Sequence, residues 1–214
     1  MRINADFEKR VVVRFADTPW VPSPAPGVER KMLDRIGEEV ARATTIVRFA
    51  PGSAFDAHTH DGGEEYLVLD GVFQDELGDF PVGSYVRNPP ASRHTPAAAD
   101  GAVILVKLHQ FDPADRVQVG IDTTKTSTST QQLFDAENES VSIETWTPGT
   151  HVSRLNPDGL EVFVLEGEYS ESGDEFAKWD WLRLPPGRDF SAKIGPKGAK
   201  VWIKSKHLAQ MLSK

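Results

Sequence analysis

The sequence predicts an all-β protein made of two tandem copies of one fold, for two reasons. Short runs rich in Val, Ile, Leu and aromatic residues are separated by Gly, Pro and Asp in both halves, which is typical of strands and turns. The second half also repeats the first at a nearly constant spacing, as expected for an internal duplication. A chain of 214 residues has room for two small domains.

The expected elements follow in chain order. Residues 10–15 (RVVVRF) should form an added strand, and the Pro-rich segment 19–26 an extended arm that Trp20 anchors by burial. The stretch 112–132, with its Thr/Ser run, is expected as a polar linker, and residues 208–212 as a short terminal helix. The main strands are expected at 44–49, 66–69, 84–87, 103–108, 141–146, 162–165, 181–184 and 201–203.

The repeat is most evident in two blocks with an offset of 96 residues. Residues 63–71 (GEEYLVLDG) lie on 159–167 (GLEVFVLEG), and 84–90 (SYVRNPP) lie on 180–186 (DWLRLPP). A preceding Pro-Gly pair matches at an offset of 97, so the second copy lacks one residue before its first block. The two halves therefore allow residue-by-residue comparison of scaffold and site.

Four candidate metal ligands occur in the first copy. The pattern Gly-x5-His-x-His-x3-Glu-x6-Gly starts at Gly52 and contains His58, His60 and Glu64; Gly-x5-Pro-x4-His follows and ends at His94. Side chains alternate along a strand, so the first two histidines point to one side. The intervening Asp-Gly-Gly can turn Glu64 back toward them, while His94 arrives from another strand. Three imidazoles and one carboxylate suit zinc or another divalent first-row metal.

These two patterns resemble the two motifs of the cupin superfamily, small jelly-roll β-barrels. The second motif departs at Ala91, where the family usually has glycine, and at Ala98, where it often has asparagine; neither is a ligand position. The phrases TPWVPSPAPGVERKML, HTHDGGEEYLVLDGVFQDELGDFPVGSYVRNPP and VKLHQ are similar to the ChrR-like cupin family, over roughly residues 10–110 and more faintly 140–205. The resemblance implies double-stranded β-helix (jelly roll) cupin barrels in two tandem copies, a bicupin.

All four candidate ligands are replaced in the second copy. The residues at their positions are Arg154 and Asn156 (or Leu155 and Pro157, if the gap falls elsewhere), Leu160 and Phe190. We therefore predict an N-terminal cupin with an intact metal site over residues 1–112, a linker over 113–135, and a degenerate C-terminal cupin without metal ligands over 136–214.

The residues kept in both copies are expected to serve the barrel. Glu65 has a counterpart in Glu161, whereas Glu64 has none, so Glu64 is the predicted ligand and Glu65 is structural. Arg87 and Arg183 are kept in the same register. We hypothesise that Glu65 pairs with Arg87 in the first copy and Glu161 with Arg183 in the second.

Other candidates receive structural interpretations. His109 could line the mouth of the pocket, although a surface or hydrogen-bonded role is favoured, and His151 and His207 are not expected to bind metal. No separate general base can be identified. Four residues are candidates for lining the pocket, although such residues are more often ordinary core: Phe55, Tyr66, Phe73 and Tyr85.

Composition excludes several classes of partner. The formal net charge of −8 argues against nucleic acid and anionic membranes, and a lysine cluster over 193–206 is read as a solvated face. The N-terminal residues lack the apolar core of a signal peptide, no window is apolar enough to cross a bilayer, and there are no cysteines. We therefore expect a cytoplasmic protein without disulfides.

The resemblance guides the functional prediction. ChrR-like anti-sigma factors hold their sigma factor with a helical domain whose zinc site uses histidine and cysteine. This chain has no cysteine, so we expect the cupin part alone, without sigma-factor capture by the family's usual means. We predict a regulatory or sensory protein, related to anti-sigma factors, that responds to a small molecule or oxidant. The alternative is a mononuclear non-haem metal enzyme such as a cupin dioxygenase.

One divalent metal per chain is expected. The resemblance implies zinc, while the donor set equally suits iron, manganese or nickel. Because histidine must be neutral to bind metal, binding should weaken as the pH falls through about 6.5. The partners to consider are a small-molecule ligand or substrate in the barrel, a regulatory protein, and a second copy of the chain. Metal binding for stability alone is less favoured, because the second copy folds without ligands.

Overall fold

A computed structural model describes residues 1–126 and 128–212. Within them the chain is almost entirely β, apart from the 3-10 turn η1 (Thr123–Lys125) and the helix α1 (Ala209–Leu212), which lies in the predicted terminal segment. Ser127, in the predicted linker, and residues 213–214, in the predicted second domain, lie outside the described residues. The described residues form two compact units. The predicted all-β fold with two tandem jelly-roll copies is confirmed.

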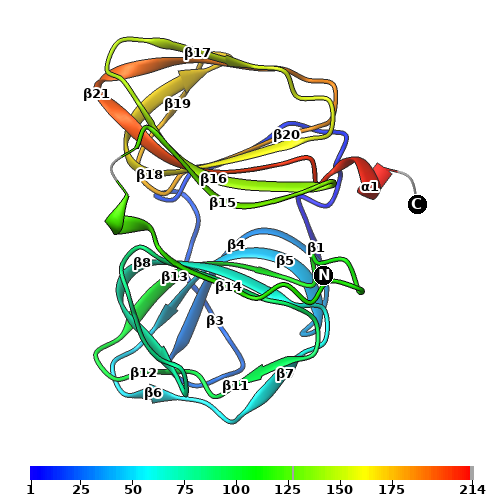
Figure 1. Cartoon of the computed structure of the whole chain (residues 1–214), viewed down its shortest axis with the longest axis vertical. Coiled ribbons are helices and arrows are strands. Elements are labelled where there is room, and N and C mark those ends of the chain that lie inside the picture. The colour runs from blue at the N-terminus through cyan, green and yellow to red at the C-terminus, as the bar shows by residue number, and fades with distance from the viewer. Residues whose placement is uncertain (127, 213–214) are drawn as a thin grey trace. The chain divides into compact units, whose positions relative to one another are not determined.

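Unit 1 contains residues 1–5 and 19–125. Its main sheet has the strand order β1-β4-β5-β13-β8-β10-β14, and β6, β7, β11 and β12 lie at the opposite side of the unit (Figure 1). The strands are β1 (Arg2–Ile3), β3 (Val21–Pro22), β4 (Val28–Gly37), β5 (Ala41–Phe49), β6 (Ser53–Ala54), β7 (His58–His60), β8 (Glu64–Asp75), β9 (Gly78–Pro81), β10 (Ser84–Asn88), β11 (Ser92–His94), β12 (Ala97–Ala98), β13 (Ala102–Leu108) and β14 (Val119–Asp122).

Unit 2 contains residues 6–18 and the described residues from 126 onward. Its sheet has the order β15-β16-β21-β18-β20-β2, with β17 beside β21 and β19 beside β18. The strands are β2 (Val11–Val13), β15 (Thr130–Ala136), β16 (Glu139–Trp146), β17 (His151–Arg154), β18 (Leu160–Glu171), β19 (Asp174–Phe176), β20 (Trp181–Leu184) and β21 (Phe190–Ser205). Every main strand expected from the sequence falls inside one of the observed strands.

The long strands form where side chains alternate between two environments. On β8, Glu64, Tyr66 and Val68 point to one face and Glu65 and Leu67 to the other, because successive residues of a strand face opposite ways. Tyr66 and Val68 belong to the apolar interior of unit 1. This interior is formed by Val28, Val47, Tyr66, Val68, Phe73, Val86, Ala98, Ala102, Ile104 and Val106.

Unit 2 receives its edge strand from a distant part of the sequence, whereas the edge strand of unit 1 follows its other strands in the chain. Strand β2 pairs with β20 in unit 2, although the chain then continues into unit 1 through β3 and β4. Strand β14 pairs with β10 in unit 1 before the chain enters unit 2. Residues 113–125, expected within the linker, therefore include a strand of the first sheet, because a short polar segment can still supply backbone hydrogen bonds to an open edge.

The N-terminal segments take the conformations expected of them. Residues 10–15 contain strand β2, and the Pro-rich arm contains β3, which pairs with β4. Trp20 at the start of this arm is half-buried rather than fully enclosed. The guanidinium of Arg48 lies 4.3 Å and the ammonium of Lys31 5.1 Å from the centre of its ring, so cation–π contacts add to burial in holding the arm.

Membrane-spanning helices are not found. Within residues 1–126 and 128–212, no helix combines the length and the hydropathy that a bilayer crossing requires.

Candidate metal centre

The three candidate histidines are placed by a two-stranded sheet. Strands β7 and β11 are antiparallel, with His58 opposite His94 and His60 opposite Ser92. Directly opposed residues of an antiparallel pair point to the same face, and so do residues two apart on one strand. All three imidazoles therefore share one face, as expected from the His-x-His pattern.

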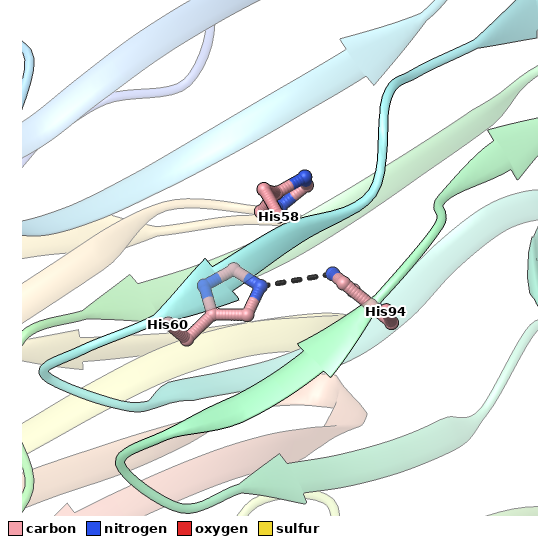
Figure 2. Close-up of side chains that lie close together, drawn as sticks. All are labelled: His58, His60 and His94. Carbon is pink, nitrogen blue, oxygen red and sulfur yellow. Dashed lines mark hydrogen bonds between the residues drawn. The ribbon is translucent and has the colours of Figure 1, made fainter.

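The imidazoles converge closely (Figure 2). The Nε2 atoms of His60 and His94 lie 2.9 Å apart. One ring nitrogen from each of the three histidines can be chosen so that all lie within 4.8 Å of one another, and these residues could hold a metal ion. The three rings stand edge to face with centres 4.8 to 5.1 Å apart.

Exposure differs across the three rings. The side chain of His94 is 5% exposed and that of His60 is 10% exposed, whereas His58 lies at the surface. Its Nδ1 lies 3.0 Å from the carbonyl of Asp56, which favours a tautomer that donates from Nδ1 and leaves Nε2 free as a ligand. The site is closed on its inner side and open toward solvent at His58.

Glu64 lies beside the histidine cluster. Its Oε2 atom is 3.5 Å from Nε2 of His60 and 3.7 Å from Nε2 of His94. Asn88, directly opposite on β10, donates from Nδ2 to the same oxygen at 3.3 Å. Burial raises the pKa of Glu64, with Asp75 adding to the rise and His94 opposing it. A cation at the cluster would favour the ionised carboxylate. The position fits the predicted ligand role, which remains a prediction.

Burial also shapes the titration of His60. Desolvation, followed by the neighbouring His58 and His109, lowers the pKa of His60 to about 4. The ring is therefore neutral at physiological pH, which is the form that binds metal. His109 thus lies near the site, at the end of β13. Its left-handed backbone (φ 55°) is a feature of the barrel, because Lys206 at the matching position of unit 2 has the same conformation (φ 71°).

The sequence patterns did not single out Asp75. Its Oδ2 atom lies 3.3 Å from Nδ1 of His94, and its side chain is 3% exposed. A carboxylate that accepts from one imidazole nitrogen orients the ring and makes the other nitrogen a better ligand. Asp75 is eleven residues beyond Glu64 and belongs to no motif, so only the curl of β8 brings it to His94.

In unit 2, the positions that match the candidate histidines are occupied by residues with different contacts. Arg154 is opposite Phe190 just as His58 is opposite His94, so the register selects Arg154 and Asn156, not Leu155 and Pro157, as the counterparts of the first two histidines. Arg154 donates to both carboxylate oxygens of Glu144 at 2.7 Å. Among the described residues, the cluster in unit 1 is the one group of this kind that could hold a metal.

The charged pairs kept in both copies occupy equivalent positions. Glu65 is directly opposite Arg87, and Glu161 directly opposite Arg183, so the members of each pair point to the same face. All four side chains are at most 2% exposed. This arrangement is the one that the predicted ion pairs need; the pairs themselves remain predictions.

The remaining candidates divide by the face they occupy. Phe55, Tyr66 and Phe73 contribute to the interior of unit 1. The hydroxyl of Tyr85 instead donates to Glu65 at 2.6 Å, so this side chain lies on the other face of the sheet.

Two of the remaining histidines lie in unit 2. His151 is exposed beside the hydroxyls of Ser153 and Ser191, and His207 lies 2.8 Å from the carboxylate of Glu161.

Comparisons with known proteins bear on the family and on the fold of this chain. Residues 8–112 match the model of the ChrR cupin-like domain. These residues belong to the ChrR cupin-like family. The matched segment, the ChrR cupin-like domain of this chain, contains all four candidate ligands. It also contains Asp75, which contacts His94. No curated protein matches the chain by sequence.

Solved structures show the fold of the whole chain. A candidate dioxygenase from Nostoc punctiforme aligns with a TM-score of 0.75 at 14% identity, covering 94% of this chain and 84% of that one. The pirin YhhW of Escherichia coli, solved in complex with nickel(II), aligns with a TM-score of 0.70 at 11% identity over 92% and 98% of the two chains. A variant of the oxalate decarboxylase of Bacillus subtilis aligns with a TM-score of 0.62 at 13% identity over 93% and 77%.

Proposed function

We propose that this protein is a metal-binding regulatory cupin that responds to a small molecule or oxidant. One divalent ion would be held by His58, His60, His94 and Glu64. The observation that carries the proposal is the convergence of the ring nitrogens of the three histidines, two of them only 2.9 Å apart, beside a buried carboxylate. Neutral imidazoles brought this close gain most by sharing a cation.

The chemistry of the donors fits several metals. Three imidazoles and a carboxylate suit zinc, iron, manganese and nickel, so the choice of zinc rests on the family. A bound metal would supply a Lewis-acid position for an oxygen donor of a small molecule. Buried His94 and Glu64 would anchor it, and the exposed edge at His58 would admit the ligand. The regulatory role would further require a partner protein that reads the ligand-bound state.

A second candidate function is a mononuclear non-haem metal enzyme such as a dioxygenase. The observation that favours it is the same exposed edge, because a metal reachable from solvent has positions for substrate and oxygen. Asp75 would then act through His94 by orienting its ring.

The test is the metal content of untagged protein purified without chelator, measured by elemental mass spectrometry. The matched variants are a double His58→Ala, His60→Ala change and a control His151→Ala, which removes an exposed histidine from unit 2. About one zinc per chain, absent from the double variant and kept in the control, is expected. Stoichiometric iron, manganese or nickel would favour the enzyme, and equal metal in all three proteins would reject the site.

A further inference from the structure

The two copies differ along one whole face of the barrel, not only at the ligands. In unit 1 this face carries Tyr66, opposite Val86, and Asn88, opposite Glu64. The matching positions of unit 2 are Val162, opposite Leu182, and Leu184, opposite Leu160. Three polar groups of the first face, Glu64, Tyr66 and Asn88, have thus become aliphatic. Residues needed to build the barrel would be expected in both copies. Tyr66 and Asn88 are polar only in the first copy, which favours a role for them in the site rather than in the scaffold.

Two hydroxyl groups on this face have no hydrogen-bond partner among the described residues. One is the hydroxyl of Tyr66, a residue only 1% exposed, and the other is Oγ of Ser92. A buried hydroxyl without a partner is unfavourable, since it has given up its hydrogen bonds to water. A bound ligand is one way in which such a group is satisfied.

Both side chains lie on the faces that carry the candidate metal ligands. Tyr66 follows Glu64 by two residues on β8, so both side chains face the interior. The Tyr66 ring contacts Phe73 with centres 5.1 Å apart, and Phe73 in turn lies 6.3 Å from His94. Ser92 is directly opposite His60, and therefore on the metal side of β11.

The surroundings indicate the class of ligand. The phenol is protonated at neutral pH and donates, so the ligand must present an acceptor oxygen. Phe73 is buried, and Phe49, Phe55 and Phe80 are partly buried against the same cluster, which provides an aromatic wall for an apolar body. Close to the carboxylates of Glu64 and Asp75, an anionic oxygen would be tolerated only beside a divalent cation.

We infer that Tyr66 is a ligand-positioning residue whose hydroxyl donates to a carboxylate oxygen of a small organic acid with an apolar body, bound at the metal. Ser92 would provide a second polar contact near the other side of the histidine cluster. The inference rests on the proposed metal site and adds to it the class of molecule that the site recognises.

The test uses the full chain loaded with cobalt(II), whose visible absorption reports on metal coordination. Benzoate and acetate are the probes, and the variants are Tyr66→Phe and Ser92→Ala. The matched control is Tyr169→Phe, because Tyr169 is also a buried tyrosine whose hydroxyl has no partner in the described part of the chain, but it lies in unit 2. Cobalt content is measured first for every protein.

Benzoate should change the wild-type spectrum and bind more tightly than acetate. Tyr66→Phe should weaken benzoate binding on the order of tenfold, as for loss of one hydrogen bond to a charged acceptor, and leave the spectrum of the ligand-free protein unchanged. Ser92→Ala should weaken it less, and Tyr169→Phe not at all. Equal affinity in wild type and Tyr66→Phe, or an equal loss in Tyr169→Phe, overturns the inference.

The remaining outcomes separate the two proposals. If the wild-type protein takes up one cobalt but benzoate leaves its spectrum unchanged, the ligand class is wrong while the metal site stands. If the wild type takes up no cobalt, the proposed function fails and the inference fails with it. A higher melting temperature of metal-free Tyr66→Phe would further support an unsatisfied hydroxyl held for a ligand.

Discussion

The carboxylate of Asp75 lies 3.3 Å from Nδ1 of His94, so this ring contacts a buried acid at one nitrogen and faces His60 with the other. The contact comes from the far end of the strand that also carries Glu64. One strand thus supplies both a candidate ligand and the group that orients another candidate ligand.

This contact predicts a loss of metal affinity when the carboxylate is removed. Asp75→Ala should weaken metal binding by about 10- to 100-fold, because the His94 ring loses both its fixed orientation and the acid that makes Nε2 more basic. Competition with a chromogenic chelator measures the change. Asp70→Ala removes an exposed acid from the same strand and should have no effect. Equal affinities in the two variants would leave Asp75 without a role.

The low pKa of His60 predicts how the metal-free protein responds to acid. In the folded state this pKa is about 4, against about 6.5 in the unfolded chain, so between these values the unfolded state binds more protons. The stabilising contribution is complete above pH 6.5 and is lost as the pH falls toward 4. Its size is at most about 3 kcal/mol.

Chelator-treated wild type and His60→Gln should be compared by urea unfolding at several pH values. The difference in unfolding free energy between them should shift against the wild type as the pH falls from 6.5 to 4 and stay constant above pH 7. The raised pKa of Glu64 is common to both proteins, so its effect cancels to first order. A pH-independent difference would contradict the burial of His60.

Two glycines of unit 1 predict different costs for the same substitution. Gly71 and Gly52 both have positive φ, 68° and 78°. A Cβ at Gly71 would lie 2.2 Å from the carbonyl oxygen of Gly101, whereas a Cβ at Gly52 meets nothing within 4 Å. Gly52→Ala should therefore cost about 1 kcal/mol from backbone strain alone, and Gly71→Ala at least about 3 kcal/mol. Thermal unfolding of the two variants decides this, and similar melting temperatures would contradict it.

The N-terminal segment predicts a stability effect far from the metal. The Nη2 atom of Arg10 lies 2.6 Å from Oε2 of Glu171, whose side chain is only 2% exposed. Arg10→Ala leaves this carboxylate unpaired and should destabilise unit 2 by about 2 to 3 kcal/mol. Metal content should not change. The neighbouring Lys9→Ala, which removes a solvent-exposed pair with Asp6, should leave the unfolding midpoint unchanged. Loss of metal from Arg10→Ala would contradict the prediction that this ion pair affects the stability of unit 2 but not the metal site of unit 1.

The sequence predicted those features that depend on neighbours along the chain. The side-chain period of a strand puts His58 and His60 on one face, and comparison of the copies separated Glu64 from Glu65. Asp75 was missed because its meeting with His94 depends on how far β8 curls. Tyr85 was named as a candidate for lining the pocket for a similar reason: the alternation along a strand shows which residues share a face, but not which face is inside the barrel.

The sheets that the two edge strands join could also not be predicted from the sequence. Residues 11–13 (VVV) are apolar and residues 119–122 (VGID) are mixed, and neither sequence indicates which sheet the strand will complete. Long-range pairing is decided by which open edge is available once the larger sheets have formed, and that edge is a property of the folded units.

Because β2 lies ahead of most of unit 1 in the chain but completes the sheet of unit 2, the C-terminal half is not a self-sufficient module. A fragment that begins after residue 125 would lack this edge strand and expose the free edge of β20. Any attempt to isolate unit 2 must therefore supply residues 6–18 as well.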